Sequence, residues 1–210
     1  LVSCLDVLHA FAPVTDADTL RIPNIARHVS PAIMSYRGIQ YQSMAPTVMQ
    51  TSELGWLESH LWILSGLYGC VRPFDAVMPY RLEMGAKLAI DDKRDLYAFW
   101  GDRLARIIAS NGNATTVVNL ASVEYARAVL PHIGPKASII TCIFGEELRH
   151  GKPLQRASAS KKARGSMVRW MAEHAIEDAC QLPAFNVGYR YTPELSSEDT
   201  LVFLNNATSF

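Results

Sequence analysis

Seven basic side chains lie within the segment from Arg149 to Trp170, and this segment contains no acidic residue. Such a density of positive charge is typical of a surface that binds phosphate groups and releases their counterions. A run of charge is also common on an ordinary solvated helix face, so the segment alone leaves both interpretations open. The seven residues are Arg149, Lys152, Arg156, Lys161, Lys162, Arg164 and Arg169.

Residues 159–175 predict a helix that carries four of these cations. Successive residues of a helix advance by about 100°, which leaves Lys161, Lys162, Arg164 and Arg169 facing away from a stripe of apolar residues. That stripe consists of Ala163, Met167, Trp170 and Met171. We therefore expect a buried Met/Trp stripe and a cationic face, with an additional anion site at the first N–H groups of the helix. A membrane-surface helix is disfavoured, because the single stripe with Trp170 suits a protein core.

The segment Ser65–Gly69 reads Ser-Gly-Leu-Tyr-Gly and follows a predicted helix over residues 52–64. A helix-hairpin-helix motif uses such a turn to bring backbone N–H groups to a DNA phosphate, and Arg72 is placed to add a charge. That motif usually spaces its glycines two apart, whereas Gly66 and Gly69 are three apart. A helix C-cap explains the same glycines.

Several polar residues interrupt apolar segments and predict a pocket, because buried polar groups need partners. Ion pairing between neighbours is the alternative explanation. The sequence contains none of the usual nucleophile, phosphate-loop or zinc-protease motifs, and its four cysteines and six histidines are scattered. It therefore predicts no cofactor and no metal site. The candidate pocket residues are Arg81, Glu83, Asp102, Arg103, Asn119, Ser122 and Glu124.

The chain has 210 residues, a formal net charge of zero and 49% hydrophobic residues. These values indicate an ordinary globular protein, read here as one domain over residues 1–210. The apolar opening is a poor signal peptide and no run is long enough to cross a bilayer. The sequence does not begin with Met, so we expect its true N-terminus to be missing.

The elements expected around these residues are mixed without strict alternation, which favours an α+β fold over a doubly wound sheet. Helices are predicted over 95–110, from Ser122 to Pro131 and over 159–175, with a turn or hairpin near residues 145–155. Strands are predicted over 78–84, 115–120 and 137–144, and two more near the C-terminus. Residues 1–50 are predicted to be rich in loops, with a short helix and a strand near Ile33 and Tyr41.

Six blocks of this sequence together resemble the YaaA family of peroxide stress proteins. In order along the chain they are SPAIMSYRGIQYQSMAP, LSGLYGCVRPFDAVMPYRLEMGAKL, LYAFWGDRL, VVNLASVEY, ITCIFGE and KKARGSMVRWMAE. The resemblance implies a single compact mixed α/β domain in the bacterial cytoplasm. It also implies protection from hydrogen peroxide, by limiting free iron and the oxidative damage that iron causes.

The resemblance further implies binding of duplex and of bent or branched DNA, through a helix-hairpin-helix element and a positively charged cleft. It assigns the hairpin to Ser65, Gly66, Gly69 and Arg72. It assigns the cleft to Arg81, Lys161, Lys162, Arg164 and Arg169. Family members begin with a strand of the type Ile-Ser-Pro-Ala-Lys, which this sequence lacks.

Two other functions are compatible with the same residues. The cations would serve an enzyme that acts on a phosphorylated or nucleotide-like small molecule, with Arg81, Glu83, Asn119 or Glu124 at its chemical centre. A deep narrow pocket would favour this enzyme, and a broad open groove would favour DNA. A domain that only binds a protein partner would need a large exposed apolar patch.

Overall fold

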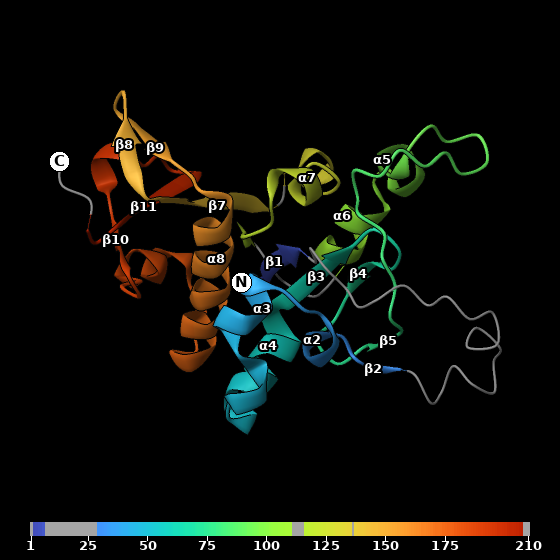
Figure 1. Cartoon of the computed structure of the whole chain (residues 1–210), viewed down its shortest axis with the longest axis horizontal. Helices are drawn as coiled ribbons and strands as arrows, with labels where there is room; N and C mark the ends of the chain where they lie inside the picture. The colour runs from blue at the N-terminus through green and yellow to red at the C-terminus, as the bar shows by residue number, and fades with distance from the viewer. Residues whose placement is uncertain (1, 7–28, 111–115, 136, 208–210) are drawn as a thin grey trace.

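A seven-stranded sheet forms the centre of the computed structural model, which describes residues 2–6, 29–110, 116–135 and 137–207 (Figure 1). The strand order is β10-β11-β7-β6-β1-β3-β4. The five inner strands pair in parallel, whereas β10 and β4 pair antiparallel with β11 and β3 at the two edges. For β1 only the backbone is described, and it pairs with β3 on one side and β6 on the other.

The strands of this sheet are β1 (Val2–Asp6), β3 (Leu61–Ser65), β4 (Gly69–Val71), β6 (Thr116–Asn119), β7 (Ser138–Gly145), β10 (Tyr189–Tyr191) and β11 (Thr200–Asn205). Two small antiparallel pairs join β2 (Ser30–Pro31) to β5 (Ala76–Val77), and β8 (Glu147–Arg149) to β9 (Lys152–Leu154). The α-helices are α2 (Ala32–Ser35), α3 (Ile39–Met44), α4 (Thr51–His60), α5 (Leu96–Trp100), α6 (Arg103–Ala109), α7 (Val123–Ala126) and α8 (Ala157–Glu173). Short 3-10 helices are η2 (Pro46–Val48), η3 (Leu130–His132), η4 (Ala179–Ala184) and η5 (Pro193–Leu195).

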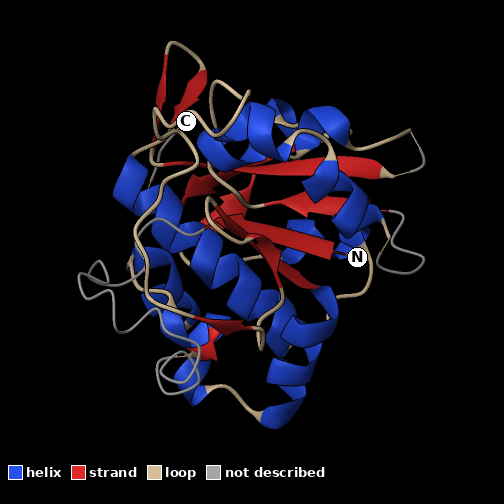
Figure 2. Cartoon of the chain, turned by 90° about the vertical axis from the view of Figure 1, so that its right-hand side faces the viewer, coloured by secondary structure: helices blue, strands red, loops and turns tan. Residues whose placement is uncertain are grey.

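Helices cover both faces of the sheet (Figure 2). On one face α2, α3, α4 and α8 pack against side chains such as Ile63, Val118 and Phe144. On the other face α5, α6 and α7 pack against Leu64 and Val117, the neighbours of two of those residues along the strands. Adjacent residues of a strand point to opposite faces, which is why these inner strands read as continuous apolar runs.

The expected mixed α/β fold is confirmed, and several predicted elements have the expected type. Strands occur as β6, β7, β10 and β11, a hairpin occurs as β8–β9, and the long basic helix occurs as α8. The parallel pairing of the inner strands was not part of the expectation. Among the described residues, no helix is long and apolar enough to span a membrane.

The helix predicted over residues 52–64 is wrong in its second half. Helix α4 ends at His60 and the chain continues as β3, in which all five residues are buried. The spacing of Leu57, Leu61 and Leu64 fits a helix, but a fully buried strand is apolar at every position and satisfies the same spacing. The run LWILS is therefore a strand because both of its faces are covered.

Three other predicted elements differ from expectation. The helix predicted over 95–110 is broken into α5 and α6 at Gly101, whose φ of 54° is left-handed. Residues 78–84 form no strand, although their burial alternates as predicted between buried Tyr80 and Met84 and exposed Arg81 and Glu83. Ile39–Met44 is the helix α3 and not a strand. The loop-rich segment predicted around Pro13 and Pro23 lies outside the described residues.

Candidate functional site

Helix α8 buries the apolar stripe that its sequence predicts. Ala163, Met167, Trp170 and Met171 are all buried, and the helix packs against α3, α4 and β7. Gly165 allows the closest approach, because a methyl group at this position would overlap the carbonyl oxygen of Gln40 in α3. The helix is thus fixed to the sheet along one side, which leaves its polar residues to the other sides.

The four predicted cations of α8 lie in different surroundings. Lys162 is exposed and Lys161 is half-buried. Arg169 donates from Nε to Glu173 Oε1 at 2.7 Å, one turn further along the helix. Arg164 is half-buried and lines a cavity beside β7. The cations therefore do not form one uniform face. Arg169 is paired within the helix, whereas Lys161 and Lys162 lie in its first half.

The β8–β9 hairpin adds exposed cations directly before α8. Arg149 and Lys152 flank the turn at His150 and Gly151, both of which have a positive φ. Arg156 is also exposed and forms an ion pair with Glu147 of β8 at 2.9 Å. We refer to Arg149, Lys152, Lys161 and Lys162 as the basic surface.

The Ser65–Gly69 segment is a turn between two strands, which corrects the predicted helix-hairpin-helix. It joins β3 to β4, and Ser65 pairs with Gly69 across the hairpin. Gly69 has a φ of 77°, and a side chain on Gly66 would approach the carbonyl oxygen of Leu82 to 2.6 Å. Both glycines are needed, one for a left-handed conformation and one for close packing. Hairpins with three-residue loops commonly end in a glycine of this kind, which accounts for the spacing of three.

Ser65 is fully buried and contacts a group of tyrosines that the sequence analysis did not identify. Its hydroxyl bonds to the hydroxyl of Tyr80 and accepts from the backbone N–H of Tyr68 at 2.9 Å. Tyr36 and Tyr68 meet Tyr80 edge-on, with ring centroids 6.3 Å and 5.3 Å away. Burial raises the pKa of Tyr36 and of Tyr80 above the usual value, so both phenols stay protonated.

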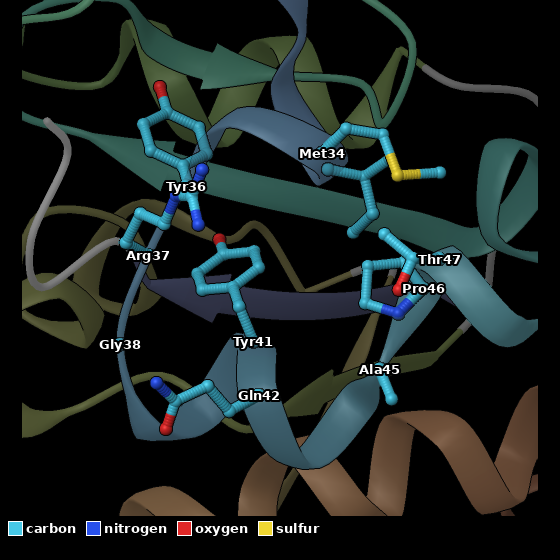
Figure 3. Close-up of a pocket in the computed structure, with 10 residues that line it drawn as sticks. Met34, Tyr36, Arg37, Gly38, Tyr41, Gln42, Ala45, Pro46 and Thr47 are labelled. Atoms are coloured by element: carbon cyan, nitrogen blue, oxygen red, sulfur yellow. The ribbon is translucent and has the colours of Figure 1, made fainter.

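A cavity of about 360 Å³ lies beside these tyrosines (Figure 3). Figure 3 shows the Tyr41 ring rising from α3 toward Tyr36 and Arg37, with Pro46 and Thr47 on the opposite side. The rings of Tyr36 and Tyr41 are 5.8 Å apart, and both side chains are buried. The sequence signal for this cavity is the pair of tyrosines around Arg37-Gly38, which the sequence analysis treats only as possible anchors of a short helix and a strand.

Arg72 and Arg81, both predicted to contact DNA, differ in their surroundings. The Arg72 guanidinium lies over the Trp62 ring at 4.4 Å and donates to the carbonyl oxygens of Leu61 and Ser59. Burial lowers the pKa of this guanidinium below its usual value. Arg72 thus holds the end of α4 against β3, whereas Arg81 is exposed.

The predicted pocket residues divide into two places. Glu124 accepts a hydrogen bond from the Gly85 backbone N–H at 2.6 Å, and its carbonyl oxygen accepts from the Tyr97 hydroxyl at 3.1 Å. Glu124 therefore anchors the segment that contains exposed Glu83. Ser122 is the N-cap residue of α7. Asn119, in contrast, lines the same cavity of about 380 Å³ as Arg164.

The described part of the chain contains no group of three or more His, Cys, Asp or Glu side chains placed to hold an ion. The described cysteines Cys70, Cys142 and Cys180 form no disulfide with one another.

Comparison with known proteins gives a consistent picture. A family model described as peroxide stress protein YaaA matches residues 7–195. A UPF0246 protein of Pediococcus pentosaceus is 47% identical over 179 residues, which cover 85% of this chain and 70% of the relative. UPF0246 proteins of Desulfitobacterium hafniense and Limosilactobacillus reuteri are 44% and 42% identical. Each match covers 86% of this chain, and 71% and 72% of the respective relative.

Proposed function

This chain belongs to the family of the peroxide stress protein YaaA, and from that premise we propose that it binds DNA through the phosphate backbone. The proposed contacts are those of the basic surface, with Arg81 as a further contact. In this role the protein acts in peroxide stress and limits iron-dependent oxidative damage to DNA. The proposed limitation of iron-dependent damage is supported only by the resemblance to the family. We propose the cytoplasm as its location, because bacterial DNA is found there.

The observation that carries the proposal is the exposure of cations on two consecutive elements. Arg149 and Lys152 project from the hairpin, and Lys162 projects from the first half of α8, which begins three residues after β9 ends. The whole protein has no net charge, so this local excess must be balanced by acidic residues elsewhere. Phosphate oxygens, and not base edges, are the ligands that isolated Lys and Arg side chains bind most readily.

Binding of this kind depends on salt and tolerates sequence. Each phosphate that is neutralised releases counterions, so the logarithm of the affinity falls linearly with the logarithm of the salt concentration. Three or four contacts would give a slope of about −3 to −4. Two duplexes of the same length and different sequence are expected to bind with similar affinity.

The test is a fluorescence anisotropy titration of a labelled duplex at two salt concentrations. We expect Lys162→Glu to weaken binding about tenfold at low salt and to reduce the salt slope by about one. Lys93→Glu is the matched control, because Lys93 is an exposed lysine that pairs with Asp92 at 2.7 Å in the turn before α5. Helix α5 lies away from α8 (Figure 1). Equal binding by the Lys162→Glu variant and the wild type would remove the basic surface from the proposal.

The preference for bent or branched DNA is tested with the same proteins. A four-way junction and a straight duplex of equal length are compared at one salt concentration. We expect tighter binding of the junction, because two duplex arms present phosphates to both the hairpin and α8. Equal affinities would limit the proposal to duplex DNA.

A further inference from the structure

The sheet has a gap at the carboxyl end of β6. Asn119 is the last residue of β6 and pairs with Thr141, whereas β7 continues to Gly145 beside β11. The chain passes from β1 to β3 on one side and then returns to β6 on the other side of β1. In open sheets of parallel strands, ligands bind at the carboxyl ends where the direction of strand addition reverses. The carboxyl end of β6 forms one side of the place where the direction of strand addition reverses.

The cavity of about 380 Å³ opens at this gap. Its apolar wall consists of Ala126 of α7, Leu130 of η3, and Cys142 and Ile143 of β7. The volume falls in the range of pockets that hold small organic molecules. Burial raises the pKa of the Cys142 thiol to about 12, so this side chain stays neutral and contributes apolar surface.

Polar groups stand around the apolar wall. Asn119 is 5% exposed, and its orientation is fixed because Oδ1 accepts from the Ala121 backbone N–H at 3.1 Å and Nδ2 donates to Thr141 Oγ1 at 3.3 Å. Arg164 reaches the cavity from α8. Arg127 lines its rim from the end of α7, where the guanidinium lies over the Tyr97 ring at 4.7 Å. These arginines are the charged groups among the described residues that line the cavity, so its charge is positive.

We propose that this cavity binds a small organic anion whose apolar body, about one ring system in size, lies under α7 and whose carboxylate or phosphate faces Arg127 and Arg164. The apolar wall selects against inorganic anions, and the two guanidinium groups select against neutral aromatic molecules. Aromatic carboxylates and nucleoside monophosphates share this chemistry. The site is distinct from the basic surface, because Lys162 and the hairpin cations do not line the cavity.

Isothermal titration calorimetry on the full chain tests the site with four probes: benzoate, cytidine monophosphate, inorganic phosphate and benzyl alcohol. We expect benzoate or cytidine monophosphate to bind at least about tenfold more tightly than inorganic phosphate and benzyl alcohol. Binding of benzoate would identify the ligand as a carboxylate, and binding of cytidine monophosphate would identify it as a phosphate. Failure of both organic anions to bind, or equal binding of inorganic phosphate, would overturn the proposal.

Two variants remove the charges separately. We expect Arg127→Gln and Arg164→Gln each to weaken binding of the organic anion about tenfold. Arg127 is exposed and its variant loses only a surface contact with the Tyr97 ring, so it should unfold close to the wild-type temperature even if the Arg164 variant does not. Arg106→Gln is the control, since Arg106 is an exposed arginine of α6 that pairs with Asp102. Unchanged binding in the Arg127→Gln variant would contradict the assignment.

Binding of the organic anion and binding of DNA can be tested separately. Lys162→Glu should weaken DNA binding and leave binding of the organic anion unchanged, because Lys162 lies outside the cavity lining. Arg127→Gln should do the reverse. Loss of both activities in the Lys162→Glu variant would show that the organic anion binds to the basic surface and not in the cavity.

Discussion

At the scale of single residues, Gly165 decides how closely α3 and α8 pack. We expect Gly165→Ala to lower the free energy of unfolding by about 1–3 kcal/mol, because the added methyl group overlaps the backbone of Gln40 and the helices must separate. Urea unfolding measures this change.

Gly55 provides the matched control for this substitution. It lies in helix α4, and a methyl group there would have no neighbour within 4 Å. Gly55→Ala should therefore raise the free energy of unfolding by about 0.5–1 kcal/mol, since alanine loses less backbone entropy in a helix. A Gly165→Ala variant that is as stable as Gly55→Ala would contradict the close contact between α3 and α8.

The sequence predicted the kind of several site residues better than their arrangement. Asn119 was identified because an amide in an apolar strand needs partners, and it has two. Tyr36 and Tyr41 were missed, because a tyrosine in an apolar segment looks like a core residue until its neighbours are known. The cations of α8 were found from charge, but helical periodicity does not show that Arg169 pairs with Glu173 or that Arg164 turns toward the sheet.

At the scale of elements, Asp95 caps the start of α5, which the sequence pattern predicts as a single helix together with α6. Its Oδ1 accepts a hydrogen bond from the Ala98 backbone N–H at 2.8 Å. We expect Asp95→Ala to lower the free energy of unfolding by about 1 kcal/mol, because that N–H loses its acceptor at the helix N-terminus.

Asp95→Asn should recover most of this loss, since asparagine caps helices about as well as aspartate. Asp92→Ala, which removes a carboxylate from the preceding turn, is the control for loss of charge. Equal stability of the Asp95→Ala and Asp92→Ala variants in urea unfolding would show that the cap contributes little.

The elements themselves could be predicted where one pattern dominated. β7, the β8–β9 hairpin and α8 have clear apolar runs, turn residues or periodicity. The junction between α4 and β3 could not be predicted, because a leucine-rich segment satisfies helical spacing and strand burial equally. Leu61–Ser65 is a strand because it pairs with β1, which is distant in the chain, and with β4, which follows it.

At the scale of the whole molecule, buried phenols make stability sensitive to high pH. Burial raises the pKa values of Tyr36, Tyr80 and Tyr189 above the unfolded value of about 10. Above that pH the unfolded chain has lost these protons and the folded chain retains them. The stability that these protonated phenols contribute is therefore fully present below pH about 10. It is lost as the pH rises further, by at most about 1.4 kcal/mol per pH unit for each such group.

Urea unfolding between pH about 8 and pH about 11 measures this fall. Tyr36→Phe should make it less steep, because one titrating group is removed from the buried set. Constant stability across this range would show that these phenols ionise as readily in the folded protein as in the unfolded one.

The position of β1 has a consequence for how the molecule assembles. Its backbone forms the middle of the sheet, yet Ser3 pairs with Leu61 and Val2 with Val117. During synthesis β1 leaves the ribosome before β3, and it finds its second neighbour only after β6 has also been made. Contacts so distant along the chain slow folding, so one edge of β1 stays without its neighbouring strand until β6 emerges.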